Sequence, residues 1–277
     1  MLRMGGGDHL RNHLDQLIRR NRIPGIQYVM TDANGVEYYG GRRDVGDDLL
    51  VEADTTLMAS SSTKVVTAAA ALQLVEQEHL QLDEPLSTYY SEHPYGDKVT
   101  VHHLLTHTSG IPNPLPLKWL HLVEDHDSFD EEVALKAVMR RSPTLLFEPG
   151  EKYSYSNIAY WLLGKVIQVA SGRNYCDYLH ENVFAQLGIS SKELSCRVTD
   201  LSRHAHGYQP KYTLLGLLLY LMMDGNLVSA SHGARFHLQA VYMNGPAYGG
   251  LVGTRGFAKF LQDQLRPQPQ LFTSATR

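Results

Sequence analysis

The spacing of apolar residues changes along the first forty positions. Between residues 9 and 22 the apolar side chains recur every three or four positions, which predicts an amphipathic helix; they are Leu10, Leu14, Leu17 and Ile18. Pro24-Gly25 should end this helix. Residues 25–41 then alternate between apolar and polar positions, and Asn34-Gly35 is typical of a two-residue turn. The sequence therefore begins as helix, strand, turn and strand, with a hairpin over residues 26–39.

Helical periodicity returns after residue 59. A helix is expected from Ser60 onward, because apolar residues from Val65 to Val75 share one face. A second helix is expected after Tyr155-Ser156-Asn157, with Gly172 at its C-terminal cap. The apolar run from Leu214 to Met223 is predicted to be a buried helix. We find no convincing pair of strands after residue 59, so the expected organisation is an α/β segment over 1–58 and a mainly helical domain over 59–277.

Composition excludes several classes of protein. The net charge is −4 and basic residues are not clustered, which argues against a nucleic-acid partner. The two cysteines, Cys176 and Cys196, are expected to be free thiols, since they form no CxxC pair. No apolar run approaches the ~20 residues of a membrane span, and residues 1–7 lack the apolar core of a secretory signal, so a cytoplasmic location without membrane association is predicted. Neither a metal site nor a cofactor is expected.

The segment Ser61-Ser62-Thr63-Lys64 is an S-x-x-K sequence at the start of a predicted helix. Residues three apart share a helix face, so the lysine amine can reach the serine hydroxyl. Serine needs a base to become a nucleophile, and burial can lower the pKa of a lysine enough for it to serve. Ser60 is the expected helix cap, and Ser60 and Ser62 are rival nucleophiles that lack a lysine three positions further on.

Tyr155-Ser156-Asn157 supplies a second set of polar groups at the start of the later helix. A tyrosine beside an ammonium group can move a proton between a nucleophile and a leaving group. The Asn157 amide could hold the lysine and a substrate carbonyl. A capped helix with a packed tyrosine is the structural alternative for this segment. Together with the S-x-x-K sequence, however, it predicts a site for acyl transfer.

In this order the motifs resemble the serine β-lactamase-like superfamily, which includes class C β-lactamases, penicillin-binding DD-peptidases and related esterases. The resemblance rests on the nucleophile segment 57–64, on Leu104 to Pro112 (LLTHTSGIP), and on Tyr155 and Asn157 with the following YWLLG. It implies an α+β fold in which an antiparallel sheet with flanking helices joins a mainly helical domain. It also implies that Ser61 is the nucleophile, Lys64 the base, Tyr155 the acid/base and Asn157 the substrate-orienting residue.

The third motif of that superfamily, Lys-Thr-Gly or His-x-Gly on a strand, is not found beyond Gly249 to Gly253. We therefore expect the last strands of the sheet to be absent from this chain, with a second polypeptide or another copy completing it. The leading functional hypothesis is a serine carboxylesterase that acts on small esters and depends on such a segment. The alternatives are a class C-like β-lactamase or DD-peptidase that takes a lactam or peptide, and a truncated scaffold that binds acyl ligands or a partner without catalysis.

Overall fold

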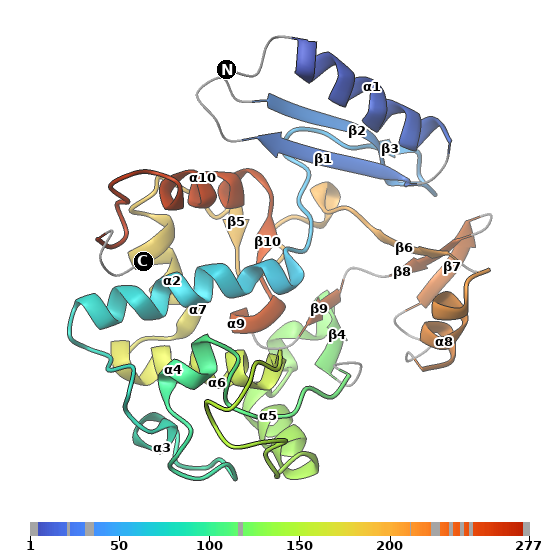
Figure 1. The fold of residues 1–277 in the computed structure, drawn as a ribbon. Coiled ribbons are helices and arrows are strands. Elements are labelled where there is room, and N and C mark those ends of the chain that lie inside the picture. Colours follow the sequence, from blue (N-terminus) through green and yellow to red (C-terminus); the bar gives the residue numbers. More distant parts are fainter. Residues whose placement is uncertain are drawn as a thin grey trace.

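The computed structural model describes residues 5–20, 23–30, 36–115, 119–210, 212–222, 228–232, 235–238, 241–243 and 246–273. In Figure 1 a small sheet with one helix lies at the top and a group of helices lies below it. A second small sheet with a short helix lies to the right.

The helix and hairpin at the start of the chain are confirmed. Helix α1 (Gly5–Arg19) begins four residues before the predicted start, and its Leu14 is buried. Strand β1 (Gly25–Met30) pairs antiparallel with β2 (Val36–Asp44), which places Tyr28 opposite Tyr38. The Tyr38 hydroxyl donates to Asp15 Oδ1 at 2.6 Å and so ties α1 to the sheet. The Asn34-Gly35 turn lies outside the described residues.

A third strand, β3 (Leu49–Leu50), pairs with the other edge of β2 beyond a bulge. The sheet has the order β1-β2-β3, so β2 is its central strand.

The helical part is built on α2 (Thr63–Glu76) and α6 (Asn157–Ser171), which pack on each other and on α9 (Pro246–Gly249). A Cβ on Gly164 would lie 2.5 Å from that of Ala247, so glycine is what allows α9 to approach α6 this closely. The predicted caps of α6 are confirmed, because Gly172 ends it with φ at 66°. The other α-helices described are α3 (Leu86–Tyr89), α4 (Val101–Leu105), α5 (Glu131–Arg141), α7 (Tyr175–Leu179) and α10 (Arg255–Gln264). Short 3-10 helices form at Ser60–Ser62, Val123–Ser128 and Leu201–Arg203, and a short π-helix forms at His180–Phe184.

The prediction that no strands pair after residue 59 was wrong. Three further antiparallel sheets form there, with the orders β4-β9, β5-β10 and β6-β8-β7. Their strands are β4 (Leu120–Leu122), β5 (Leu194–Ser195), β6 (Gly207–Pro210), β7 (Val228–His232), β8 (Arg235–Leu238), β9 (Val241–Met243) and β10 (Val252–Gly253). Strands of two to five residues are too short to show a clear alternation, which is why the sequence pattern did not predict them.

The division into an α/β segment over 1–58 and a helical domain over 59–277 stays a prediction. Hydrogen bonds link the two parts. The His206 amide donates to the Arg43 carbonyl at 2.8 Å, and the Tyr208 hydroxyl donates to Asp44 Oδ1 at 3.0 Å. The start of β6 is thereby attached to the end of β2.

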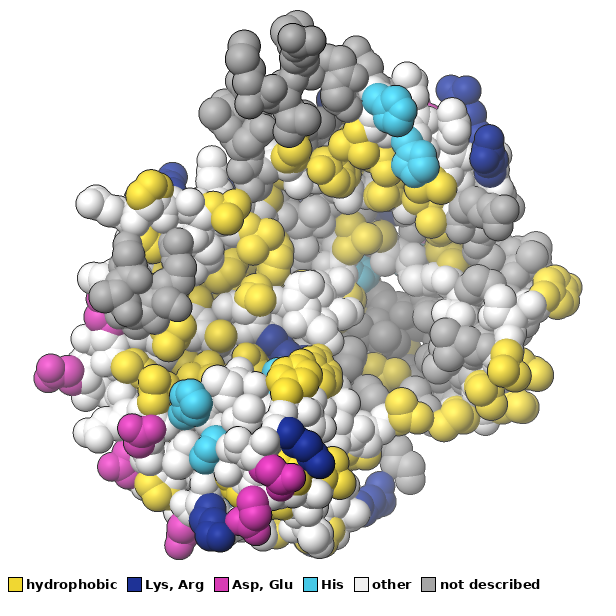
Figure 2. Space-filling model, viewed as in Figure 1, with side chains coloured by type: hydrophobic (Ala, Val, Ile, Leu, Met, Phe, Trp, Pro, Cys, Tyr) yellow, Lys and Arg dark blue, Asp and Glu magenta, His cyan; other side chains and the backbone are white. Residues whose placement is uncertain are grey.

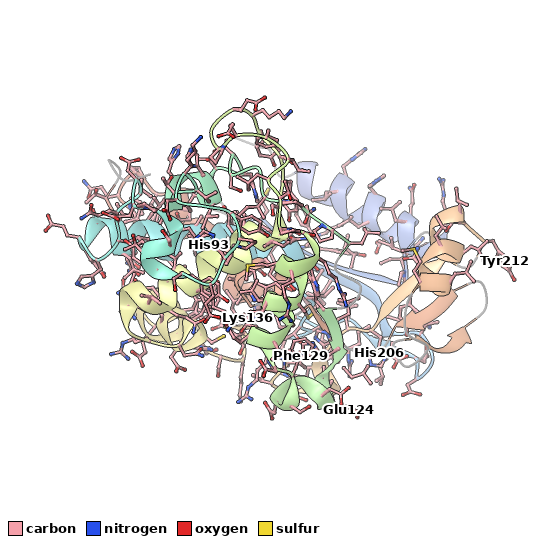
Figure 3. The ribbon with its side chains drawn as sticks, turned by 90° about the horizontal axis from the view of Figure 1, so that it is seen from below. His93, Glu124, Phe129, Lys136, His206 and Tyr212 are labelled. Atoms are coloured by element: carbon pink, nitrogen blue, oxygen red, sulfur yellow. The ribbon has the colours of Figure 1, made fainter. Side chains whose placement is uncertain are left out.

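Helix α8 (Leu214–Met222) forms where the apolar run predicts a helix, but the prediction that it is buried was wrong. Leu214 is 77% exposed and Leu221 is 70% exposed. Figure 2 shows hydrophobic side chains along this right-hand edge, and Tyr212 projects outward beside the helix in Figure 3. Among the described residues no helix combines the length and the apolar character that crossing a membrane would require.

Candidate active site

Ser61 lies in the single turn Ser60–Ser62 that leads into α2, and its side chain is exposed. Ser60 was predicted to cap the helix, and this was wrong. Ser62 occupies the N-cap position without a side-chain hydrogen bond, while Ser60 has φ at 47°. Few non-glycine residues adopt positive φ, and here the chain turns sharply just before the helix starts. This turn leaves Ser61 open to a reactant at the N-terminus of α2.

Lys64 is the second residue of α2 and is buried, at 5% exposure. Its Nζ donates to the Tyr248 carbonyl at 2.7 Å, where the sequence suggested a direct contact with Ser61. The rings of Tyr155, Tyr160 and Tyr248 surround the amine, with Nζ 4.9 Å from the Tyr155 centroid. Burial lowers the pKa of Lys64 to about 7, because the ammonium form loses its hydration. A large share of the molecules therefore carry a neutral amine near neutral pH.

Tyr155 connects the two helices that build the site. Its hydroxyl donates to Ser61 Oγ at 2.9 Å and has Asn157 Oδ1 as a second acceptor at 3.2 Å. A tyrosine has a single hydroxyl proton, so when Asn157 accepts it, Ser61 can donate its own proton to the tyrosine oxygen. The structure thus brings together all four residues predicted from the sequence: Ser61, Lys64, Tyr155 and Asn157.

The start of α6 is fixed by Pro112 and Asn113, which lie in the connection between α4 and β4. Ser156 caps the helix by accepting from the Ala159 amide at 3.2 Å, and its Oγ donates to the Pro112 carbonyl at 3.1 Å. The Asn157 amide donates to Asn113 Oδ1 at 3.0 Å. These bonds hold the backbone on both sides of Ser156, and so they fix where the side chains of Tyr155 and Asn157 point.

His107 is a part of the site that was not among the candidate residues predicted from the sequence. Its Nδ1 accepts from the Ser156 amide at 3.2 Å, and its carbonyl accepts from the Ser154 amide at 2.8 Å. The ring lies 4.6 Å from the Tyr155 ring, between centroids. Burial first, and then the nearby Lys64 charge, lower the pKa of His107 to about 4. His107 is therefore neutral at physiological pH, which the acceptor role of Nδ1 requires.

Tyr248 is the second residue that the sequence did not indicate. It lies in α9, 184 positions beyond Lys64, and its backbone carbonyl accepts the hydrogen bond from the lysine. The glycine-rich segment after it runs beside the start of α2. The Leu251 carbonyl accepts from the Ala59 amide at 2.8 Å, and the Leu251 amide donates to Thr63 Oγ1 at 3.2 Å.

The profile of the family described as "Beta-lactamase" matches residues 10–276. The chain belongs to the beta-lactamase family. Penicillin-binding protein 4* of Bacillus subtilis is 28% identical over 204 residues, which cover 72% of this chain and 45% of that protein. Monacolin J acid methylbutanoyltransferase of Aspergillus terreus is 28% identical over 218 residues, covering 68% of this chain and 52% of that protein.

The fold is shared with solved structures as well. The D-amino acid amidase of Ochrobactrum anthropi SV3, solved with L-phenylalanine amide, superposes with a TM-score of 0.80 at 22% identity. The match covers 97% of this chain and 73% of the amidase. This similarity confirms the β-lactamase-like α+β fold. The chain spans about half the length of the curated relatives it matches.

Proposed function

We propose that this member of the beta-lactamase family is a serine hydrolase that forms an acyl-enzyme on Ser61. The observation that carries the proposal is the 2.9 Å contact between the Tyr155 hydroxyl and Ser61 Oγ, beside a buried lysine. An exposed serine hydroxyl alone is a poor nucleophile, and a base within hydrogen-bond reach is what activates it.

In the proposed reaction the Tyr155 hydroxyl gives its proton to the neutral Lys64 amine, and the Tyr155 oxygen takes the Ser61 proton as Oγ attacks the acyl carbon. Lys64 can accept this proton because burial keeps a large share of its amine neutral. Return of the proton through Tyr155 to the leaving group completes acylation. A water molecule that approaches the same tyrosine then releases the acyl group. Asn157 accepts from Tyr155 and presents its amide N–H groups to a substrate carbonyl.

For the substrate we propose small carboxylic esters. One of the relatives above is by name a methylbutanoyltransferase, so a short acyl group is within the chemistry of related proteins. The alternative is a lactam or a peptide, which the similarity to a penicillin-binding protein favours. In the second alternative, a scaffold without catalysis, the site would bind acyl ligands and not turn them over.

The substrate proposal is tested by comparing kcat/KM for short aryl esters with that for a chromogenic cephalosporin. We expect the ester to be preferred, with an initial burst of phenol that reports the acyl-enzyme. Ser61→Ala should abolish the burst and Ser62→Ala should retain it. A preference for the cephalosporin would support the lactam alternative, and no turnover of either substrate would support the scaffold.

The proposed cooperation of Lys64 and Tyr155 has its own test. Groups that act as a unit give losses that do not multiply. Lys64→Ala combined with Tyr155→Phe should therefore be little slower on the ester than the slower single variant. A double variant whose loss equals the product of the two single losses would show independent roles.

We also propose that another polypeptide or a second copy of the chain completes the β1-β2-β3 sheet. Support comes from β1, which has β2 as its only strand partner among the described residues, while its own residues are all partly exposed. An open strand edge pairs readily with another chain. Light scattering after size exclusion should show a mass above that of one chain, and a stable monomer would contradict the proposal.

A further inference from the structure

A cavity of about 450 Å³ lies next to α7, and no step of the proposed reaction uses it. Both cysteines of the chain line it. Its wall also contains His126, Phe129 and Arg197. Phe129 is labelled in Figure 3, which shows this part of the molecule from below.

The two thiols come from different elements. Cys176 is the second residue of α7, where its amide donates to Asn174 Oδ1 at 2.9 Å, and its side chain is partly exposed. Cys196 follows β5 directly and is 6% exposed. The Cys176 thiol lies near enough to Cys196 to contribute to the raised pKa of that buried thiol. The wall of one cavity thus holds an accessible thiol and a buried one.

We propose that Cys176 and Cys196 form a redox-active pair, which a low-molecular-weight disulfide entering this cavity oxidises to an intramolecular disulfide. In the first step the Cys176 sulfur, as thiolate, attacks one sulfur of the small disulfide. A mixed disulfide forms and the first small thiol leaves with the proton that Cys176 lost. In the second step Cys196 attacks the Cys176 sulfur, and the second small thiol leaves with the Cys196 proton. The protein loses two hydrogen atoms and two electrons, which the small disulfide gains.

The environments of the two sulfurs set the order of these steps. Cys176 is the partly exposed thiol, so it meets the small disulfide first. Burial raises the pKa of the Cys196 thiol well above its usual range, and Cys196 is therefore a poor first nucleophile. Its position on the same cavity wall as Cys176 places it to resolve the mixed disulfide once that has formed.

One of the two segments that the disulfide would join contacts α2 close to Lys64. Tyr175, next to Cys176, shares a 2.7 Å hydrogen bond with Thr67 one turn after Lys64. Thr67 also donates to the Ala247 carbonyl at 2.6 Å. Cys196 follows β5, which pairs with β10. Closing the loop between the two cysteines restricts the unfolded chain, so the oxidised form should melt at a higher temperature.

The test treats the folded chain with glutathione disulfide and follows intact mass, free thiols and mapped peptides. We expect both thiols to disappear as one internal disulfide forms, with a rise in the midpoint of thermal unfolding that a reductant reverses. Cys196→Ser should stop at a mixed disulfide on Cys176. Cys176→Ser should react at Cys196 at least roughly tenfold more slowly.

Three results would overturn the proposal. The wild-type chain could stop at the mixed disulfide, it could form disulfides only between copies, or it could react only when unfolded in urea. None of these readouts depends on ester hydrolysis, so failure here is separate from failure of the proposed function.

Discussion

Two helices of this chain, α6 and α8, are built mainly from apolar residues, but they differ in how far those residues are buried. Helix α6 buries Trp161, Leu162 and Leu163 completely, whereas α8 exposes Leu214, Leu217 and Leu221. Helix α6 packs on α2, α4 and α9 and begins at a side-chain cap, while α8 lies at the right-hand edge of Figure 1 beside a three-stranded sheet. Apolar composition therefore specifies helix and not burial. Burial depends on which partners the rest of the chain brings.

The largest expected effect on stability comes from Trp161 in α6. Its ring lies against Trp119 and Tyr248, and its Nε1 donates to Glu131 Oε1 at 2.6 Å. Trp161→Ala should lower the free energy of unfolding by about 3–5 kcal/mol. Leu221→Ala, the matched change in α8, should alter it by less than ~0.5 kcal/mol. Urea unfolding of both variants measures the difference, and comparable losses would mean that α8 is covered in solution.

A smaller effect is expected from Lys64, the polar residue buried beside α6. Its pKa is about 7 in the folded chain against an ordinary 10.5, so the ammonium form disfavours folding. The penalty is complete below pH 7 and disappears as the pH rises to the unfolded value. Lys64→Met should therefore be more stable than wild type by about 2–4 kcal/mol at pH 6, with a shrinking difference toward pH 10.

The control for this variant is Lys192→Met, which replaces an exposed lysine and should leave the pH dependence of stability unchanged. Chemical denaturation from pH 6 to 10 gives the curves. A Lys64→Met curve parallel to that of wild type would show that Lys64 has an ordinary pKa.

The smallest expected effect on stability comes from Ser156, the N-terminal cap of α6. Ser156→Ala removes that cap and the bond to Pro112, and should cost about 1–2 kcal/mol. Asp130→Ala removes the comparable cap of α5 and should cost about 1 kcal/mol. Only Ser156→Ala should also slow acylation, by roughly tenfold, because it releases the backbone between Tyr155 and Asn157. Equal acylation rates in the two variants would remove Ser156 from the positioning of the site.

Local patterns predicted the elements whose causes are local. The hairpin and the helix after Ser62 follow from the spacing of apolar residues, and both caps of α6 follow from Ser156 and Gly172 next to the helix. The short strands β4, β5, β9 and β10 pair with segments far away in the chain, and none is long enough to carry a period.

The site divides in the same way. Ser61 and Lys64 are three positions apart on one helix, and Tyr155 and Asn157 are neighbours, so each pair could be recognised from sequence. That the two pairs meet was implied by the family resemblance and not by spacing. Lys64 donates to the backbone carbonyl of Tyr248. Every residue type has such a carbonyl, so the sequence could not indicate this partner. His107 was visible within Leu104 to Pro112, but its acceptor role depends on a pKa that burial and the nearby Lys64 charge lower.

The rate at which a fluorophosphonate labels Ser61, measured against pH with the adduct mapped, tests the central claim most directly. Lys64 must be neutral to support removal of the Ser61 proton, and the lowered pKa of His107 keeps its titration away from the same range. The rate should therefore rise with pH around a midpoint of about 7, and Lys64→Met should lose both the rate and the midpoint. An adduct on Ser60 or Ser62, or a Ser61 labelling rate that does not change between pH 6 and 8, would contradict the account.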